Sequence, residues 1–185
     1  MGVEIEKKYR LSSDEQERLR ERLRAVGATP HDEGEEFEEN ILYAGRGLDT
    51  QSQLLRLRRV GGRAILTYKE CFATSSDAGI KHRREDETRV ENPDALAAIL
   101  DALGYKPALV YEKRRATWHV ADVEVVVDEL PFGLFVEIEG EEHAINAAED
   151  LLQLTETDGE HASYPELTAR HGTEINGIIQ ARFQK

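Results

Sequence analysis

The segment VEIEKKYRL, residues 3–11, alternates in the manner of a β-strand and carries its charges on one face. Successive side chains of a strand point to opposite sides, so Glu4, Glu6 and Lys8 would lie together on one face. The other face is mostly apolar and would pack against the rest of the protein. A strand that only has to meet solvent can use Ser, Thr or Gln, so this concentration of charge indicates a more specific role.

The same arrangement recurs in other runs that we predict to be strands. These runs span residues 37–44, 53–60, 63–70, 82–91, 108–120, 122–130 and 132–140. Their charged faces would carry Arg56 and Arg58, Lys69, Glu85 and Glu87, Lys113 and Arg115, Glu124 and Asp128, and Glu137 and Glu139. Gly61-Gly62 is a two-residue hairpin signal. The other connections are also short, so we expect a mainly antiparallel sheet.

These charged faces allow two interpretations. A single strand of this kind is well explained by an antiparallel sheet with one solvated face. Like charges two residues apart on one strand, however, lie about 6.5–7 Å from each other and repel. A sheet that curls with its charged face inward would instead place rows of Glu opposite rows of Arg and Lys. We therefore predict an α+β fold, an eight-stranded antiparallel closed β-barrel (a tunnel) with a charged lumen and helices packed outside.

Helical periodicity interrupts the strands at several places. We expect helices from Ser13 to Val26, with Ser13 and Gln16 as a capping box, from Pro93 to Leu103, from Glu142 to Leu154, after Ser163, and from Glu174. The small polar segment from Thr74 to Gly79 is expected to be a loop.

The composition fits one globular domain, which we expect to span residues 1–185. Hydrophobic residues make up 39% of the chain, and this length can bury a real core. The net charge of −13 argues against binding to a nucleic acid polymer. No apolar run approaches the roughly 18 residues of a membrane span, and the first 25 residues are too charged for a signal peptide. We expect a cytoplasmic protein without membrane contact, and the Val- and Leu-rich outer faces are compatible with a homodimer.

A metal site built on cysteine or histidine is not indicated. Cys71 is the only cysteine, which excludes an internal disulfide and a Cys-based zinc site. The six histidines lack zinc-binding spacing, so His82 and His119 are expected to be surface or hydrogen-bonding residues.

The predicted lumen suits one class of ligand. Clustered Arg and Lys bind phosphate oxygens, and paired carboxylates bind hard divalent cations such as Mg²⁺, which often bridge to substrate phosphates. A polyphosphate together with Mg²⁺ or Mn²⁺ satisfies both halves. The chain has neither a P-loop nor a G-x-G-x-x-G fingerprint, so the common phosphate-binding loops are absent.

The order of these motifs resembles the motif order of the CYTH superfamily, the triphosphate tunnel metalloenzymes. The similarity rests on E-x-E-x-K at Glu4 to Lys8, R-x-R at Arg56 and Arg58, Lys69, E-x-E at Glu85 and Glu87, K-x-R at Lys113 and Arg115, Asp128, E-I-E at Glu137 to Glu139, and the run Ser163 to Leu167, which is similar to an S-Y-x-x-L element. The resemblance spans nearly the whole chain. It implies an eight-stranded tunnel and action on a triphosphate with a divalent metal.

The resemblance also implies roles for individual residues. Glu4, Glu6, Glu137 and Glu139 would hold the metal, with Asp128 as a further ligand or orienting group. The phosphates would be clamped by Arg56, Arg58, Lys69, Lys113 and Arg115. Lys8 would act beside the scissile phosphate, through charge stabilisation or proton transfer. Glu85 and Glu87 would take a second metal or orient the basic residues.

Three functions remain open at this point. The first is a metal-dependent triphosphatase that cleaves inorganic triphosphate or a small organic triphosphate. The second is a class IV adenylyl cyclase, in which the ribose 3′-hydroxyl attacks the α-phosphorus of ATP. The third is a non-catalytic module that binds polyphosphate or a nucleotide. No clear aromatic cluster for an adenine base lies near the motifs, where Tyr43, Tyr68 and Phe72 are the candidates. We favour the triphosphatase because a tunnel that fits three phosphates is sufficient for it.

Overall fold

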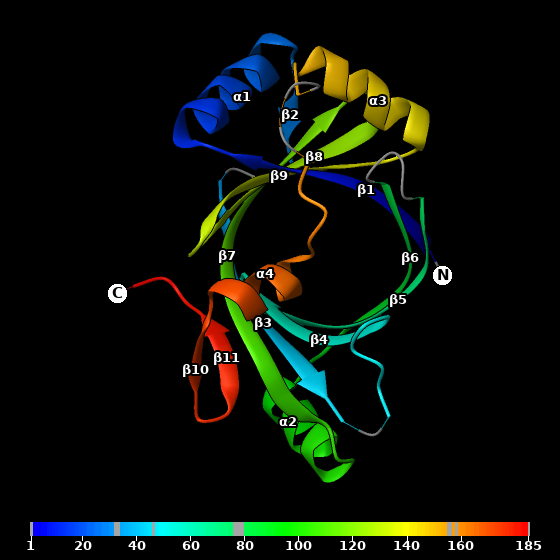
Figure 1. Cartoon of the computed structure of the whole chain (residues 1–185), viewed down its shortest axis with the longest axis vertical. Coiled ribbons are helices and arrows are strands. Elements are labelled where there is room, and N and C mark those ends of the chain that lie inside the picture. Colours follow the sequence, from blue (N-terminus) through cyan, green and yellow to red (C-terminus); the bar gives the residue numbers. More distant parts are fainter. Residues whose placement is uncertain are drawn as a thin grey trace.

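Eight strands curl around a common axis in the computed structural model of the chain (Figure 1). The structure describes residues 2–31, 34–45, 47–75, 80–154, 157 and 159–184, and it describes side chains outside residues 2–4 and 71–83. The eight strands are β1 (Gly2–Leu11), β3 (Glu36–Ala44), β4 (Gln53–Val60), β5 (Arg63–Ser75), β6 (Ile80–Arg89), β7 (Lys106–Val120), β8 (Val123–Leu130) and β9 (Gly133–Glu139). The expected loop after Thr74 begins inside β5, and its remainder at 76–79 lies outside the described residues.

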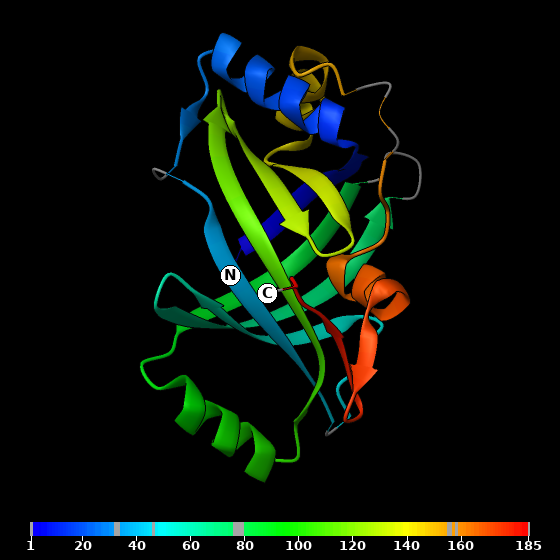
Figure 2. The same cartoon turned by 90° about the vertical axis from the view of Figure 1, so that its left-hand side faces the viewer.

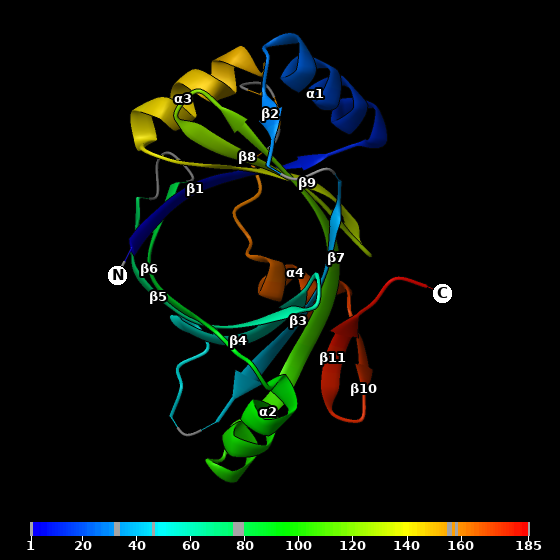
Figure 3. The same ribbon diagram turned by 180° about the vertical axis from the view of Figure 1, so that it is seen from behind.

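The strands pair in the order β7-β3-β4-β5-β6-β1-β9-β8, and β8 pairs with β7 again. Every one of these pairings is antiparallel. The predicted eight-stranded antiparallel barrel and its α+β class are therefore confirmed. The curled sheet turns one face of each strand toward a shared interior (Figure 3).

The barrel wall is incomplete on one side. Strand β8 pairs with residues 114–120 of β7, whereas residues 109–111 pair with the short strand β11 (Ile178–Ala181) in parallel. The barrel is thus joined along the second half of β7 and open beside its first half, which differs from the fully closed wall we predicted. Helix α4 (Tyr164–His171) lies on this side, against β7 and β11 (Figure 1).

Three further helices cover the outer surface. Helices α1 (Ser13–Ala25) and α3 (Glu142–Leu151) lie over the same side of the barrel, against β1 and β9, and α2 (Pro93–Ala102) lies at the opposite end of the molecule (Figure 2). Helix α1 is capped by Ser12 and Glu15 and not by the predicted Ser13 and Gln16. The reason is that Ser12 has the extended backbone of an N-cap and its main-chain N–H donates to the Glu15 carboxylate.

The core lies between the sheet and these helices and not inside the barrel. The outward side chains of β1, including Tyr9 and Leu11, pack with Leu19 and Leu23 of α1 and Ile145 of α3. A second buried cluster joins the outer face of β3–β5 to α2. The apolar faces of the strands are buried against the helices that surround the barrel. The charged faces therefore line the barrel interior.

The C-terminal segment forms a hairpin and not the helix we expected from Glu174. Strands β10 (Thr173–Ile175) and β11 are joined at Asn176-Gly177, where both residues have positive φ. Asn-Gly is a strong type I′ hairpin signal, which overrides the helical periodicity around it. None of the helices in the described residues has the length and apolar character needed to cross a membrane, and the cytoplasmic location stays a prediction.

Candidate active site

The interior of the barrel brings together the charged residues that lie far apart in the sequence. Glu6, Lys8, Arg56, Lys113 and Asp128 are each less than 10% exposed. Charged side chains are almost never buried to this degree unless they are paired. Glu6 and Lys8 lie on β1, and the other three lie on β4, β7 and β8, so the curvature of the sheet creates the cluster.

Three carboxylates form an acidic cluster between β1 and β9. Glu6 lies opposite Glu139, and Lys8 lies opposite Glu137 in the same ladder. Glu6, Glu137 and Glu139 each offer an oxygen within 4.8 Å of the others. Oxygen ligands at this spacing fit a hard divalent cation such as Mg²⁺ or Mn²⁺. The predicted ligand Glu4 has its side chain outside the described residues.

Lys8 is held in one position by three partners. Its Nζ lies 3.2 Å from a Glu137 oxygen and donates to the carbonyl of Ala162 at 3.2 Å. The same Nζ lies 4.1 Å from the ring centroid of Tyr164, which is a cation–π contact. The ammonium group therefore sits at the junction of the acidic cluster and α4.

Asp128 belongs to a group of cations and not to the acidic cluster. Its Oδ1 and Oδ2 accept from Arg115 at 2.8 and 2.6 Å, and Lys113 is 3.4 Å from Oδ2. Burial alone would raise the pKa of Asp128, but Arg115 and Lys113 outweigh it and hold this pKa well below the usual range. The same Oδ2 accepts from the Tyr164 hydroxyl at 2.8 Å, and burial beside Asp128 keeps the pKa of Tyr164 well above normal. Asp128 is thus ionised and Tyr164 neutral.

A second group of ion pairs lies on β4, β5 and β6. Arg58 is 3.1 Å from Glu87, and Lys69 is 2.8 Å from Glu85. Arg56 is 3.5 Å from Glu87 and 3.9 Å from Glu85. Among the described residues, the Nε atoms of Arg56 and Arg58 are buried without a hydrogen-bond partner. Unpaired buried N–H groups are costly, so an anion that accepts from them would stabilise this wall.

The comparisons with known proteins agree with this geometry. The family model described as "CYTH domain" matches residues 2–170. The chain belongs to the CYTH family. Members of the CYTH family generally depend on a divalent metal, and the acidic cluster is consistent with this property.

Individual CYTH relatives cover most of the chain. A protein of Methanocaldococcus jannaschii named "putative adenylate cyclase" is 27% identical over 82% of this chain and 84% of its own length. A solved structure from Pyrococcus horikoshii has a TM-score of 0.76 and 26% identity, covering 89% of this chain and 98% of that one. A Hippeastrum structure, described as a putative adenylyl cyclase with a dominant triphosphatase activity, has a TM-score of 0.63 over 97% and 100% of the chains. Its sequence identity to this chain is 17%, so this comparison supports the similarity of the fold alone.

Glu38 and Tyr164 are among the residues of the CYTH interior that the sequence reasoning missed. Glu38 on β3 is 2% exposed and lies 3.5 Å from Lys113 and 3.8 Å from Arg58. Burial would raise the pKa of Glu38, but Lys113, Arg115 and Arg58 together lower it. The alternation of residues 36–44 could have placed Glu38 inward. Tyr164 lies in the S-Y-x-x-L run, but only the tertiary structure shows its contact with Asp128.

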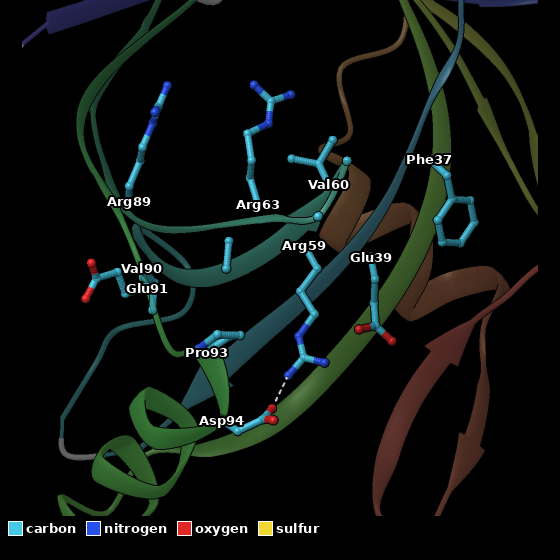
Figure 4. A pocket seen from close by; sticks show the side chains of 13 residues that line it. Phe37, Glu39, Arg59, Val60, Arg63, Arg89, Val90, Glu91, Pro93 and Asp94 are labelled. Carbon is cyan, nitrogen blue, oxygen red and sulfur yellow. Dashed lines mark hydrogen bonds and ion pairs between the residues drawn. The ribbon is translucent and has the colours of Figure 1, made fainter.

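A separate groove of about 750 Å³ lies at the rim of the CYTH barrel (Figure 4). It is lined by Phe37, three arginines and the start of α2, and Arg59 bonds Asp94 across it. None of the predicted site residues lines this groove. Its three arginines are accompanied by Glu39, Glu91 and Asp94, and the cluster of three carboxylates identified among the described residues is not part of it.

Proposed function

We propose that the chain is a divalent-metal-dependent phosphohydrolase that cleaves inorganic triphosphate or a small organic triphosphate inside the barrel. The observation that carries the proposal is that a three-carboxylate cluster and five cations, all buried or partly buried, share one barrel interior. Cations and carboxylates in one enclosed site match the two charges of a metal–triphosphate complex. A site for a bare anion would not need the cluster of Glu6, Glu137 and Glu139.

In this proposal the cations would hold the phosphates in line. Arg115 and Lys113 approach from β7, while Arg56 and Arg58 approach from β4 and Lys69 from β5. In the free protein, Glu38, Glu85, Glu87 and Asp128 neutralise these cations and hold them in position. Such pre-positioning matters because phosphoryl transfer depends mainly on alignment and charge stabilisation.

Lys8 and the acidic cluster would act at the scissile phosphate. Glu6, Glu137 and Glu139 would hold the metal, which when bound neutralises charge and polarises phosphoryl oxygens. Lys8 adjoins Glu137, so its ammonium can stabilise the charge that develops on the phosphoryl oxygens as water attacks the terminal phosphorus. Its contacts with Ala162 and Tyr164 keep it aimed at this point.

A second candidate is the class IV adenylyl cyclase reaction, and the name of the M. jannaschii relative favours it. A cyclase also has to hold adenine, and Tyr43 is buried in the outer core with α2 and so cannot serve. Tyr68 alternates with the inward Thr67 and Lys69 and therefore faces outward. The side chain of Phe72 lies outside the described residues. Neither Tyr43 nor Tyr68 therefore supplies an adenine site.

Product analysis by phosphorus NMR separates the candidates. The protein is incubated with Mg²⁺ or Mn²⁺ and either inorganic triphosphate or ATP. We expect orthophosphate and pyrophosphate from triphosphate, and no product without the metal. Cyclic AMP with pyrophosphate from ATP would establish the cyclase instead, and binding without any turnover would establish a non-catalytic module.

A further inference from the structure

Two histidines that are 88 residues apart in sequence meet at one end of the barrel. Short strand β2 (Thr29–Pro30) pairs with the end of β7, where Thr29 lies opposite His119. His31 follows β2, and its main-chain N–H donates to the Thr117 carbonyl at 2.9 Å. The His31 Nδ1 and the His119 Nε2 are 2.9 Å apart, with the rings 65° from coplanar. Both side chains are accessible to solvent.

His119 extends the charged face of β7. It follows Arg115 at an even spacing, so it points to the same side of the strand. Its cross-strand neighbour is Glu124, which in turn lies opposite Glu139 of the acidic cluster. The His119 Nδ1 is 3.9 Å from a Glu124 oxygen. The histidine pair is therefore a separate group of nitrogen donors near the acidic cluster.

We propose that His31 and His119 form a two-imidazole site for a borderline transition metal such as Cu²⁺, Ni²⁺ or Zn²⁺. Two nitrogens bound to one tetrahedral ion at 2.0–2.1 Å are separated by about 3.4 Å. The observed separation of 2.9 Å between His31 Nδ1 and His119 Nε2 is close to this value. A small rotation of the two side chains would therefore let a metal ion take the place of the shared proton. Both rings are accessible, so this rotation disturbs no buried contact.

Glu124 supports this arrangement from the far side of the His119 ring. A carboxylate near Nδ1 favours the tautomer that carries its proton there, which leaves Nε2 free to coordinate. Imidazole nitrogens favour Cu²⁺, Ni²⁺ and Zn²⁺, whereas carboxylates suit Mg²⁺ and Mn²⁺. The two neighbouring sites would therefore select different ions, and this second site is independent of the proposed triphosphatase activity.

Copper titration followed by electron paramagnetic resonance tests the site. The tag-free full chain is titrated with Cu²⁺ in excess Mg²⁺, which occupies the carboxylates. We expect one equivalent of Cu²⁺ whose spectrum shows coupling to two imidazole nitrogens. His31→Ala and His119→Ala should each remove this coupling and weaken Cu²⁺ binding at least about tenfold, the loss found for a second-shell partner alone.

His143→Ala is the matched control, because His143 is an exposed histidine of α3. It should leave the two-nitrogen spectrum unchanged. Circular dichroism verifies that each variant is folded, and if His119→Ala does not fold, His31→Ala, at an exposed position directly after β2, decides the question. A wild-type spectrum without two nitrogens, or one that survives His31→Ala, would overturn the proposal.

Discussion

At the scale of single residues, Asp128 links three parts of the site. This fully buried carboxylate bonds Arg115, Lys113 and Tyr164, which come from β7 and α4. A buried charge lowers the free energy of unfolding only slightly as long as all of its partners remain. Removing one partner leaves the others buried and unpaired, so the stability of the interior depends on this residue.

Asp128→Asn should lower the free energy of unfolding by about 3 kcal/mol at neutral pH. The folded-state pKa of Asp128 is lowered, so its contribution is present above the unfolded value of about 3.9 and is lost as the pH falls toward the folded value. As the pH falls below about 5, the free energy of unfolding should therefore decrease less in the variant than in the wild type. Urea unfolding at several pH values measures this, with the outward-facing neighbour variant Glu129→Gln as control. Equal acid sensitivity in Asp128→Asn and the wild type would contradict the prediction.

Most inward residues could be predicted from strand alternation alone. The side chain of residue i+2 returns to the same face, so Arg56 with Arg58 and Glu137 with Glu139 share a face in the structure as expected. The partners of each charge could not be predicted, because the ion pair of Arg115 with Asp128 depends on the register of β7 against β8. Glu38 was missed because the predicted strand began at residue 37, which left out Glu36 and with it the E-x-E pair of Glu36 and Glu38.

At the scale of elements, α4 connects the open side of the barrel to the interior. Ser163 accepts from the Glu166 N–H, and the Glu166 carboxylate accepts from the Ser163 N–H, which forms a capping box. The helix that begins here carries Tyr164, and the residue before the cap, Ala162, supplies the carbonyl that holds Lys8. The helix start is thus part of the candidate site.

Ser163→Ala should reduce metal-dependent triphosphate turnover, whereas Ser12→Ala should not. Each substitution removes the same type of capping box and should cost about 1 kcal/mol of stability. Only the first loosens the residues around Lys8. Thermal unfolding and phosphate-release assays on the two variants make the comparison. A similar turnover loss in both variants would mean that α4 has no specific role in positioning Lys8.

Helix starts and hairpin turns were predictable where local chemistry decides them. Ser163 was correctly placed before a helix, and Gly61-Gly62 joins β4 and β5 as expected. The parallel pairing of β11 with β7 could not be predicted, because it joins segments about 70 residues apart. This long-range contact pairs the part of β7 that β8 does not reach, beside α4.

At the scale of the whole molecule, the chain places a buried set of cations inside a protein with a net charge of −13. The acidic exterior disfavours extended polyanions, while the enclosed cations attract a compact one. The family resemblance and the strand faces together predicted this overall design. The degree of closure was beyond sequence reasoning because it depends on which strand pairs with each half of β7.

A non-hydrolysable triphosphate analogue with Mg²⁺ should stabilise the folded protein. At a concentration of 100 times Kd, the free energy of unfolding rises by about 2.7 kcal/mol, which corresponds to roughly 5–10 °C in Tm for a chain of this size. The double variant Arg58→Met and Lys69→Met should lose most of this shift. Differential scanning calorimetry gives the Tm values, and an undiminished shift in the double variant would show that the analogue binds elsewhere.

The most direct test of the central claim is the rate of metal-dependent triphosphate hydrolysis in Glu6→Gln. Removing a carboxylate from the acidic cluster should lower the rate by at least about 100-fold, because metal stabilisation of the transition state is worth several kcal/mol. The control Glu129→Gln removes the same charge from the outer face of β8, and it should retain the wild-type rate. A Glu6→Gln protein that hydrolyses triphosphate at the wild-type rate would contradict the assignment of the barrel interior as the active site.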